Sequence, residues 1–351
     1  MDTPARFGPY ELVRRIGRGG MAETFAVRRA DASGPAPLFC LKRVLPGLVE
    51  SSELLAWFVE EARLSAQLHH ANVVPVVDFG SVDGVPYLVL EHIDGVDLRA
   101  LLSDARREGV PLPYDVVAEV ARGVAFALDF AHACDADGRL RGLVHRDISP
   151  SNVLVDRHGG VKLGDFGIAK AIGSPQATRT GVLKGKIPYM APEYAAAGRF
   201  DHRSDLFALG VTLYECVTLE RPFDGPSDVE TLERILDGQH VPLTRLETHV
   251  PPLFAECVER LLAVDPCVRF ATARAFVEAL APCLPPSTAR REVARCVERA
   301  LAHRAERERI EPSTTAPDGV GTAFVDTTST AVEAPRVEPA APDAVTRTRA
   351  P

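Results

Sequence analysis

The sequence predicts an α+β fold of two lobes: a small N-terminal lobe with an antiparallel sheet and one helix, and a larger helical C-terminal lobe. Two observations indicate this. Up to Glu91 most apolar runs are short and separated by turn residues, which is typical of strands. After Asp97 the apolar residues recur every three to four positions, which is typical of helices. With 351 residues, 46% of them hydrophobic, the chain is long enough to bury a core in each lobe.

The N-terminal lobe is expected over residues 10–93, after a loose leader at 1–9. One amphipathic helix is predicted at 51–69, because apolar residues such as Phe58 and Ala62 recur there at helical spacing. The strands around it are short and bounded by glycine, proline or aspartate. In order, they are predicted in YELVRRIG, ETFAVRRA, LFCLKRVL, VVPVVDFG and PYLVLEHI.

The C-terminal lobe is expected over residues 97–284. A basic amphipathic accessory helix is predicted within 285–310, with a thin apolar stripe of Val293, Val297 and Leu301. Residues 311–351 are rich in Thr, Pro and Ala, so we expect a disordered tail that buries too little surface to offset ordering entropy. The helices of the lobe itself are predicted in DLRALLSDARREG, in PYDVVAEVARGVAFALDFAHAC, and at 205–219, 228–237, 253–264 and 272–280.

Composition excludes several classes of protein. The net charge of −8 argues against a nucleic-acid partner. The chain has no run of about 18 apolar residues and no apolar signal sequence, so we expect no membrane span and a cytoplasmic location. Its seven cysteines are scattered and form no C-x-x-C pair, which predicts reduced thiols rather than a metal or disulfide framework.

Glycines 17, 19 and 20 lie between two predicted strands in IGRGGMAETFAV. Because glycine has no Cβ, such a turn can fold closely over phosphate groups and offer them N–H donors. The turn is not a Rossmann fingerprint, because a strand follows it, and it lacks the G-K-[ST] of a Walker motif. By itself it fits an ordinary hairpin turn better than a phosphate site.

Lys42 lies inside an apolar strand, where a lysine is usually solvated at an edge. A glutamate on the following helix would give it a partner and aim its ammonium at a phosphate. Glu60 and Glu61 are both candidates, but they point about 100° apart, so only one faces inward. Glu61 lies three residues after Phe58 on the apolar side, so we choose Glu61.

Asp147, Asn152 and Asp165 follow one another in HRDISPSNVLVDRHGGVKLGDFG. Phosphoryl transfer needs a group that orients the attacking hydroxyl, and hard oxygen ligands for a metal ion on the phosphates. Each residue alone could be a turn-forming Asx. The three together, in this order, favour phosphoryl transfer.

These stretches together resemble the eukaryotic-type (Hanks-type) protein kinase family, and most closely its bacterial Ser/Thr kinases. The resemblance covers about residues 7–284. It implies the two-lobed protein-kinase fold, ATP as the phosphate donor and Mg²⁺ or Mn²⁺ as the metal ion. Protein substrates with Ser or Thr hydroxyls are the implied acceptors.

The resemblance also implies roles for single residues. Asp147 is the implied catalytic base, Lys42 and Glu61 the implied ion pair, and Asn152 and Asp165 the implied metal ligands. Within the glycine loop, alanine replaces the third glycine of the family, and threonine stands where a valine usually covers the adenine. The implied nucleotide-binding residues are Ile16, Gly17, Arg18, Gly19, Gly20, Met21, Ala22, Glu23, Thr24, Cys40, Lys42, Leu90, Glu91, Ile93, Asp97 and Leu154.

The segment at 167–190 resembles the activation segment, which the APE motif at 191–193 closes. By the resemblance, Glu193 pairs with Arg269, and Asp205 braces the catalytic loop.

Arg146 corresponds to an arginine that binds an activation-loop phosphate in the family. We therefore predict autophosphorylation of Thr178 and Thr180, since a phosphate adds nearly two negative charges. An unmodified surface turn is the alternative.

Two positions depart from the family pattern in a complementary way. Family Ser/Thr kinases usually carry Lys where this chain has Ser149, and Thr where it has Lys186. In the family these two side chains meet beside the catalytic aspartate. We predict an exchange: Lys186 supplies the charge for the γ-phosphate, and Ser149 hydrogen-bonds near Asp147. The alternatives are Lys184 as a stand-in, or a solvated Lys186 in an impaired enzyme.

The predicted function is a serine/threonine protein kinase that also phosphorylates its own activation segment. A pseudokinase, meaning a scaffold module that binds nucleotide or partners without efficient catalysis, is the alternative that Ser149 and Ala22 suggest. Small-molecule kinases fit less well, because a full APE segment shapes a peptide site. No nucleic-acid or membrane partner is expected. The helix at 288–309 packs on the larger lobe or binds a protein partner.

Overall fold

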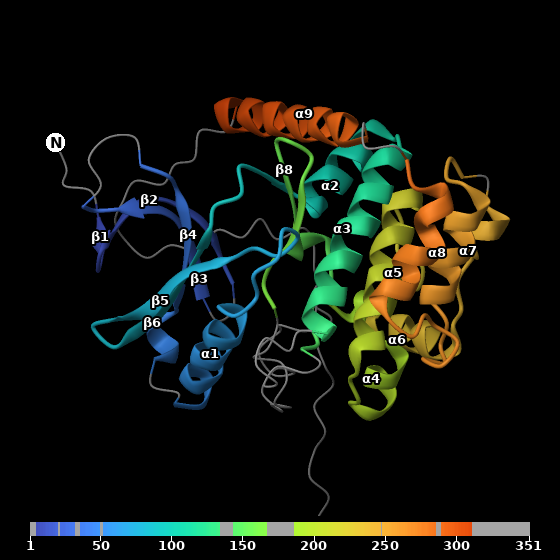
Figure 1. Cartoon of the computed structure of the whole chain (residues 1–351), viewed down its shortest axis with the longest axis horizontal. Helices are drawn as coiled ribbons and strands as arrows, with labels where there is room; N and C mark the ends of the chain where they lie inside the picture. Colours follow the sequence, from blue (N-terminus) through green and yellow to red (C-terminus); the bar gives the residue numbers. More distant parts are fainter. Residues whose placement is uncertain are drawn as a thin grey trace, which may run out of the picture.

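A sheet lobe and a helical lobe lie side by side in the computed structural model, in which the chain passes from one to the other once, after β6 (Figure 1). The described residues are 5–19, 22–31, 36–49, 52–133, 143–166, 186–246, 248–285 and 289–310. This architecture confirms the predicted two-lobed α+β fold.

The N-terminal lobe is a six-stranded antiparallel sheet with the order β1-β2-β3-β4-β6-β5. One helix, α1 (Ser52–Ser65), packs on β5 and β6. Phe7, within the predicted leader, is buried in the core of this lobe, so the lobe begins earlier than predicted. The strands are β1 (Arg6–Phe7), β2 (Tyr10–Arg18), β3 (Ala22–Arg29), β4 (Phe39–Val44), β5 (Val76–Val82) and β6 (Val85–Glu91).

The C-terminal lobe is organised around α3 (Tyr114–Ala133), which packs against α5, α8, α9 and β9. Because α3 is rich in Ala and Val on nearly all sides, a central position buries the most apolar surface. The remaining helices are α2 (Leu98–Glu108), α4 (Pro192–Ala197), α5 (His202–Thr218), α6 (Asp228–Asp237), α7 (Pro252–Leu261), α8 (Ala273–Leu280) and α9 (Ala289–Ile310).

A small three-stranded sheet lies on this lobe next to the chain crossing. Its strands are β7 (Gly95–Asp97), β8 (Val153–Asp156) and β9 (Val161–Leu163), in that order. Five short 3₁₀ helices complete the described structure: η1 (Pro46–Leu48), η2 (Pro150–Asn152), η4 (Ile187–Tyr189), η5 (Leu243–Arg245) and η6 (Ala281–Cys283).

Capping residues explain where the helices begin and end. Asp97 caps α2 by accepting a hydrogen bond from the N–H of Ala100 at 2.7 Å, and Gly109 ends the same helix with a left-handed φ of 67°. The helix predicted to begin at 205 begins earlier, because Asp201 and Ser204 form a capping box before α5.

Among the described helices, none combines the length and apolarity needed to cross a bilayer.

Candidate active site

Two non-glycine residues between the lobes, Arg146 and Asp165, have left-handed backbone, with φ of 65° and 52°. Such a conformation costs about 1–2 kcal/mol and persists where the surroundings hold it, often at functional sites. Asp205 of α5 holds the first one, because its carboxylate accepts hydrogen bonds from the N–H of His145 at 2.7 Å and of Arg146 at 2.8 Å. The predicted brace is therefore confirmed.

His145 is buried and connects two parts of the site. Its Nδ1 accepts a hydrogen bond from the N–H of Asp147 at 3.2 Å, and its Nε2 lies 3.0 Å from the carbonyl oxygen of Gly164. Burial lowers the pKa of this imidazole, so the ring is neutral and donates from Nε2. One ring therefore fixes both Asp147 and the residue before Asp165.

Two side chains from the described part of the chain contact the carboxylate of Asp147. The Nδ2 of Asn152 donates to its carbonyl oxygen at 2.7 Å and to its Oδ2 at 3.0 Å. The ammonium of Lys186 contacts the same Oδ2. The position predicted for Lys186, beside Asp147, is thus the one that it occupies.

Lys42 on β4 lies 3.2 Å from Oδ1 of Asp165, which follows β9. This ammonium holds the pKa of the Asp165 carboxyl below its usual range, so the carboxylate is charged at neutral pH. Glu61 lies on α1, but its side chain is outside the described part of the structure. The Lys42–Glu61 pair therefore stays a prediction.

A cavity of about 610 Å³ lies between the lobes and contains Lys42, Asn152 and Asp165 in its walls. Most of the residues predicted to bind a nucleotide through the strands and the lobe connection line it. They are Ile16, Thr24, Cys40, Lys42, Leu90, Glu91, Ile93, Asp97 and Leu154.

Glu23, also predicted to bind the nucleotide, is turned away from this cavity. In the register of β3 and β4, Thr24 lies opposite Lys42, and Glu23 lies opposite Arg43. Because neighbouring residues of a strand face opposite sides of the sheet, Glu23 faces away from the side of Thr24 and Lys42. The Glu23 carboxylate lies 3.1 Å from the guanidinium of Arg43 instead. Gly17, Arg18, Gly19 and Ala22 do not line the cavity either, and Gly20 and Met21 lie outside the described residues.

Among the described residues, the hydrogen bond predicted for Ser149 near Asp147 is not formed. Ser149 is buried, and its hydroxyl has no hydrogen-bond partner among the described groups. Asn152 and Lys186 both contact Oδ2 of Asp147, and Ser149 precedes η2 without a side-chain cap.

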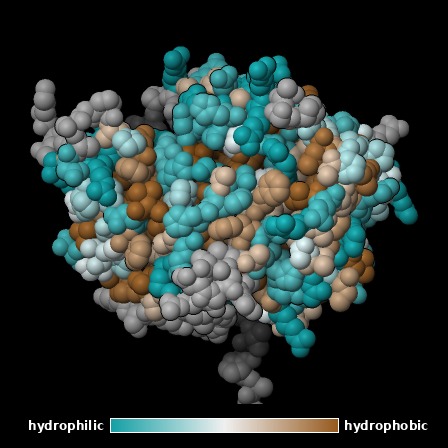
Figure 2. All heavy atoms as spheres, viewed as in Figure 1, coloured by the Kyte–Doolittle hydropathy of each residue, from teal (hydrophilic) through white to brown (hydrophobic). Residues whose placement is uncertain are grey.

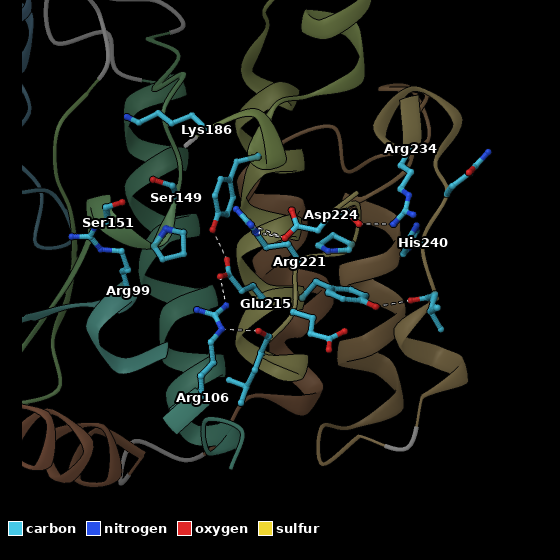
Figure 3. A pocket seen from close by; sticks show the side chains of 18 residues that line it. Arg99, Arg106, Ser149, Ser151, Lys186, Glu215, Arg221, Asp224, Arg234 and His240 are labelled. Carbon is cyan, nitrogen blue, oxygen red and sulfur yellow. Dashed lines mark hydrogen bonds and ion pairs between the residues drawn. The ribbon is translucent and has the colours of Figure 1, made fainter. Parts of the chain in front are cut away.

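A second, larger hollow of about 1260 Å³ adjoins the first, and Ser151 lines both. Ser149 and Lys186 lie at its wall, as Figure 3 shows. In the wall of the same hollow, the Tyr189 hydroxyl donates to Glu215, which also pairs with Arg106; Figure 3 labels Glu215 and Arg106.

Comparison with known proteins identifies this arrangement. The protein kinase domain family matches residues 10–280. The chain belongs to this family. Among curated proteins, the tyrosine-protein kinase MasK of Myxococcus xanthus is 41% identical over 278 residues, which cover 78% of this chain and 43% of that protein. The serine/threonine-protein kinase PknD of Mycobacterium tuberculosis is 34% identical over 271 residues, covering 77% and 39%.

A solved structure is similar as well. The crystal structure of the Mycobacterium tuberculosis PknI kinase domain matches with a TM-score of 0.59 and 27% identity, covering 80% of this chain and 99% of that domain. The present kinase chain spans only about two fifths of the length of the two curated relatives above.

The end of the kinase activation segment is anchored as predicted. Arg269, fully buried, donates to both carboxylate oxygens of Glu193 at 2.8 and 2.7 Å. Burial raises the pKa of Glu193, but hydrogen bonds from Arg269 and Ser204 outweigh it, so the pKa lies below its usual range. The predicted Glu193–Arg269 pair is confirmed.

The predicted phosphorylation sites Thr178 and Thr180 lie outside the described residues. Their predicted partner, Arg146, stacks over the ring of Phe200 at 5.4 Å from its centre. The phosphate contact stays a prediction.

Sequence reasoning missed two groups of residues in this kinase. Tyr189 and Glu215 of the larger hollow carry no signal in the sequence, because 26 positions separate them. Leu301, Arg304 and Ala305 of α9 line the smaller cavity, although they follow the family-like region. Leu301 belongs to the apolar stripe that was recognised, but the stripe alone does not say what lies beside it.

Proposed function

We propose that this kinase domain transfers the γ-phosphoryl group of ATP to Ser or Thr hydroxyls of proteins. One observation carries the proposal: the two adjoining hollows meet at Ser151, with Lys42 and Asp165 in the wall of one and Lys186 in the wall of the other. A donor nucleotide in the smaller cavity and an acceptor peptide in the larger one would meet beside Asp147.

The residues of the smaller cavity suit ATP. Leu90 and Ile93 offer apolar and backbone contacts for the adenine, and the Lys42 ammonium offers positive charge to the phosphates. The Asp165 carboxylate and the Asn152 amide oxygen, which the Asn152 hydrogen bonds to Asp147 leave unused, are hard donors that fit Mg²⁺. Bound there, Mg²⁺ would neutralise phosphate charge; Mn²⁺ has the same ligand preference.

Asp147 is proposed to orient the acceptor and take its proton. The acceptor oxygen forms a bond to the γ-phosphorus while the bond from that phosphorus to the bridging oxygen of ADP breaks. The proton of the hydroxyl passes to the Asp147 carboxylate. Asn152 fixes that carboxylate through its two hydrogen bonds, so the base keeps one orientation.

Lys186 is proposed to supply the positive charge that the family usually takes from the position of Ser149. Its ammonium lies against Asp147, at the junction where the γ-phosphoryl group would pass to the acceptor. Positive charge at that place stabilises the transferring group. Ser149, buried and without a hydrogen-bond partner among the described groups, is proposed to bond to the substrate. Ordering of the activation segment by phosphate on Thr178 or Thr180, bound to Arg146, would then set the position of Lys186.

The proposed acceptor type rests on the relatives and, through the resemblance to the family, on Pro150, because the tyrosine branch usually has a different catalytic loop there. PknD is named a serine/threonine kinase, whereas MasK is named a tyrosine kinase, so tyrosine is the second candidate. The cytoplasmic location and the absence of nucleic-acid partners stay predictions from the sequence.

The test is phosphotransfer from radiolabelled ATP with Mg²⁺ to the chain itself and to peptide pools that contain only Ser, only Thr or only Tyr. Label on Ser or Thr that disappears in Asp147→Asn supports the proposal. Label on Tyr alone would mean that the acceptor residue is tyrosine and not Ser or Thr. Bound ATP without transfer to any polypeptide would identify a pseudokinase and overturn the proposal.

A further inference from the structure

The helix α9 is firmly seated on the C-terminal lobe. It packs against α2, α3, β7 and β8 and runs along the edge of the molecule above α2 and β8, with its C-terminal end toward the sheet lobe (Figure 1). Its outward surface is largely hydrophilic (Figure 2). The side that faces the lobe is a buried stripe at helical spacing: Ala289, Val293, Cys296, Val297 and Ala300.

Polar contacts fix the position of α9 along its axis. Arg290 at its start lies 3.1 Å from Glu119 of α3, and His303 near its end lies 3.2 Å from Asp104 of α2. At Gly159, in the turn between β8 and β9, an added Cβ would lie 2.3 Å from the carbonyl oxygen of Arg290. The helix backbone and this turn are therefore in direct contact.

This seat places one side of α9 in the cavity that contains Lys42 and Asp165. Leu301, one turn after the buried Val297, is half-buried and lines the cavity, as do the exposed Arg304 and Ala305 of the next turn. The wall is therefore contributed by three parts of the chain: the strands of the sheet lobe, the C-terminal lobe and the helix that follows it.

We infer that α9 is part of the nucleotide site and sets its affinity for ATP, an inference that rests on the proposed function. Leu301 and Ala305 give the cavity an apolar wall that removes part of a bound nucleoside from water. Arg304 adds a cation to a site for a polyanion, and Arg14 of β2 lines the same cavity. The nucleotide is thus held by three units: the sheet lobe, the C-terminal lobe and α9.

The test is the Kd for ATP, measured by calorimetry on the full chain. Ala305→Trp fills part of the cavity, and its matched control is Ala302→Trp, since Ala302 is exposed and does not line the cavity. Arg304→Glu reverses one charge of the wall, and its matched control is Arg291→Glu, an exposed position of the same helix outside the cavity. We expect Ala305→Trp and Arg304→Glu to weaken ATP binding about three- to tenfold, and the controls to match wild type.

The thermal midpoint without nucleotide separates lost binding from lost folding. The inference is supported if a cavity variant has the wild-type thermal midpoint without nucleotide, but its midpoint rises less than that of wild type when ATP is added. If wild type binds ATP and both cavity variants bind it as tightly as their controls, α9 only packs on the lobe and the inference is wrong, while the proposed function stands. If wild type binds no ATP, the inference and the proposed function are both wrong.

Discussion

The ammonium of Lys186 contacts the carboxylate of Asp147, although 39 positions separate the two residues. Ser149, two residues after Asp147, is buried beside this pair, and its hydroxyl has no partner among the described groups. The positive charge beside Asp147 in this pair therefore comes from the segment before the APE motif. This contact predicts that phosphotransfer depends on Lys186.

Lys186→Ala should lower the kcat of phosphotransfer by about 10²–10³, because removal of one stabiliser of transition-state charge commonly costs that much. The KM for ATP should change less, since Lys42 is the residue proposed to contact the phosphates of the bound nucleotide. Steady-state kinetics at saturating peptide measure both. Near-normal turnover would refute the role of Lys186, and Lys184→Ala, tested in parallel, would show whether Lys184 carries the charge instead.

The reverse exchange supplies the sharper form of this test. Lys186→Thr with Ser149→Lys restores the arrangement usual in the family. If the two positions share one function, the double variant should be more active than Lys186→Thr alone, and the two effects should not add. Losses that simply multiply would mean that the two sites act independently.

Breaking the buried pair of Arg269 and Glu193 should strongly destabilise the C-terminal lobe. Arg269→Ala leaves the carboxylate of Glu193 in a largely buried place without its main partner, so we expect a loss of about 3–5 kcal/mol in the free energy of unfolding. Arg274→Ala is the matched control, since Arg274 is 71% exposed and pairs with Asp129, and should change stability by less than about 1 kcal/mol. Urea denaturation of both variants checks this, and equal losses would contradict it.

Much of the fold was predictable because its signals are local. The helix predicted at 228–237 has those bounds in the structure, since Ser227 and Gly238 are strong caps. Asp147, Asn152 and Asp165 were recognisable because they lie close together in the chain. Lys186 was placed correctly only through its resemblance to a family position.

The remainder depends on contacts between distant segments. The glycine-loop sequence alone places Glu23 at the nucleotide site. Which face of the sheet a residue takes is decided by strand register, however, and here the pairing of Glu23 with Arg43 sets that register. The hydroxyl of Ser149 has no partner among the described groups, while Asn152 and Lys186 both contact Oδ2 of Asp147. The position of α9 depends on its contact with the turn at Gly159, and no local sequence pattern predicts that contact.

Cys40 lines the cavity proposed to hold the nucleotide, yet its thiol should resist alkylation. Burial, together with the negative charge of Asp165, raises the pKa of its thiol to about 12, so almost no thiolate exists between about pH 7 and pH 9. Iodoacetamide at about pH 8 should label the exposed Cys267 well before Cys40. Mass spectrometry of tryptic peptides gives both rates, and unfolding in urea should make Cys40 reactive. Labelling of Cys40 in the native state as fast as that of Cys267 would contradict the burial of this thiol.

Substitution of two glycines separates backbone strain from the seating of α9. Gly84 and Gly159 both have a φ of 79°, but a Cβ at Gly84 meets nothing within 4 Å, whereas one at Gly159 would meet the carbonyl oxygen of Arg290 at 2.3 Å. Gly84→Ala should therefore cost only the left-handed strain, about 1–2 kcal/mol. Gly159→Ala should cost clearly more and should also weaken ATP binding, because it displaces the start of α9. Chemical denaturation and calorimetry measure the two effects. Equal stability losses with unchanged ATP affinity would mean that α9 can shift at this turn without consequence for the cavity.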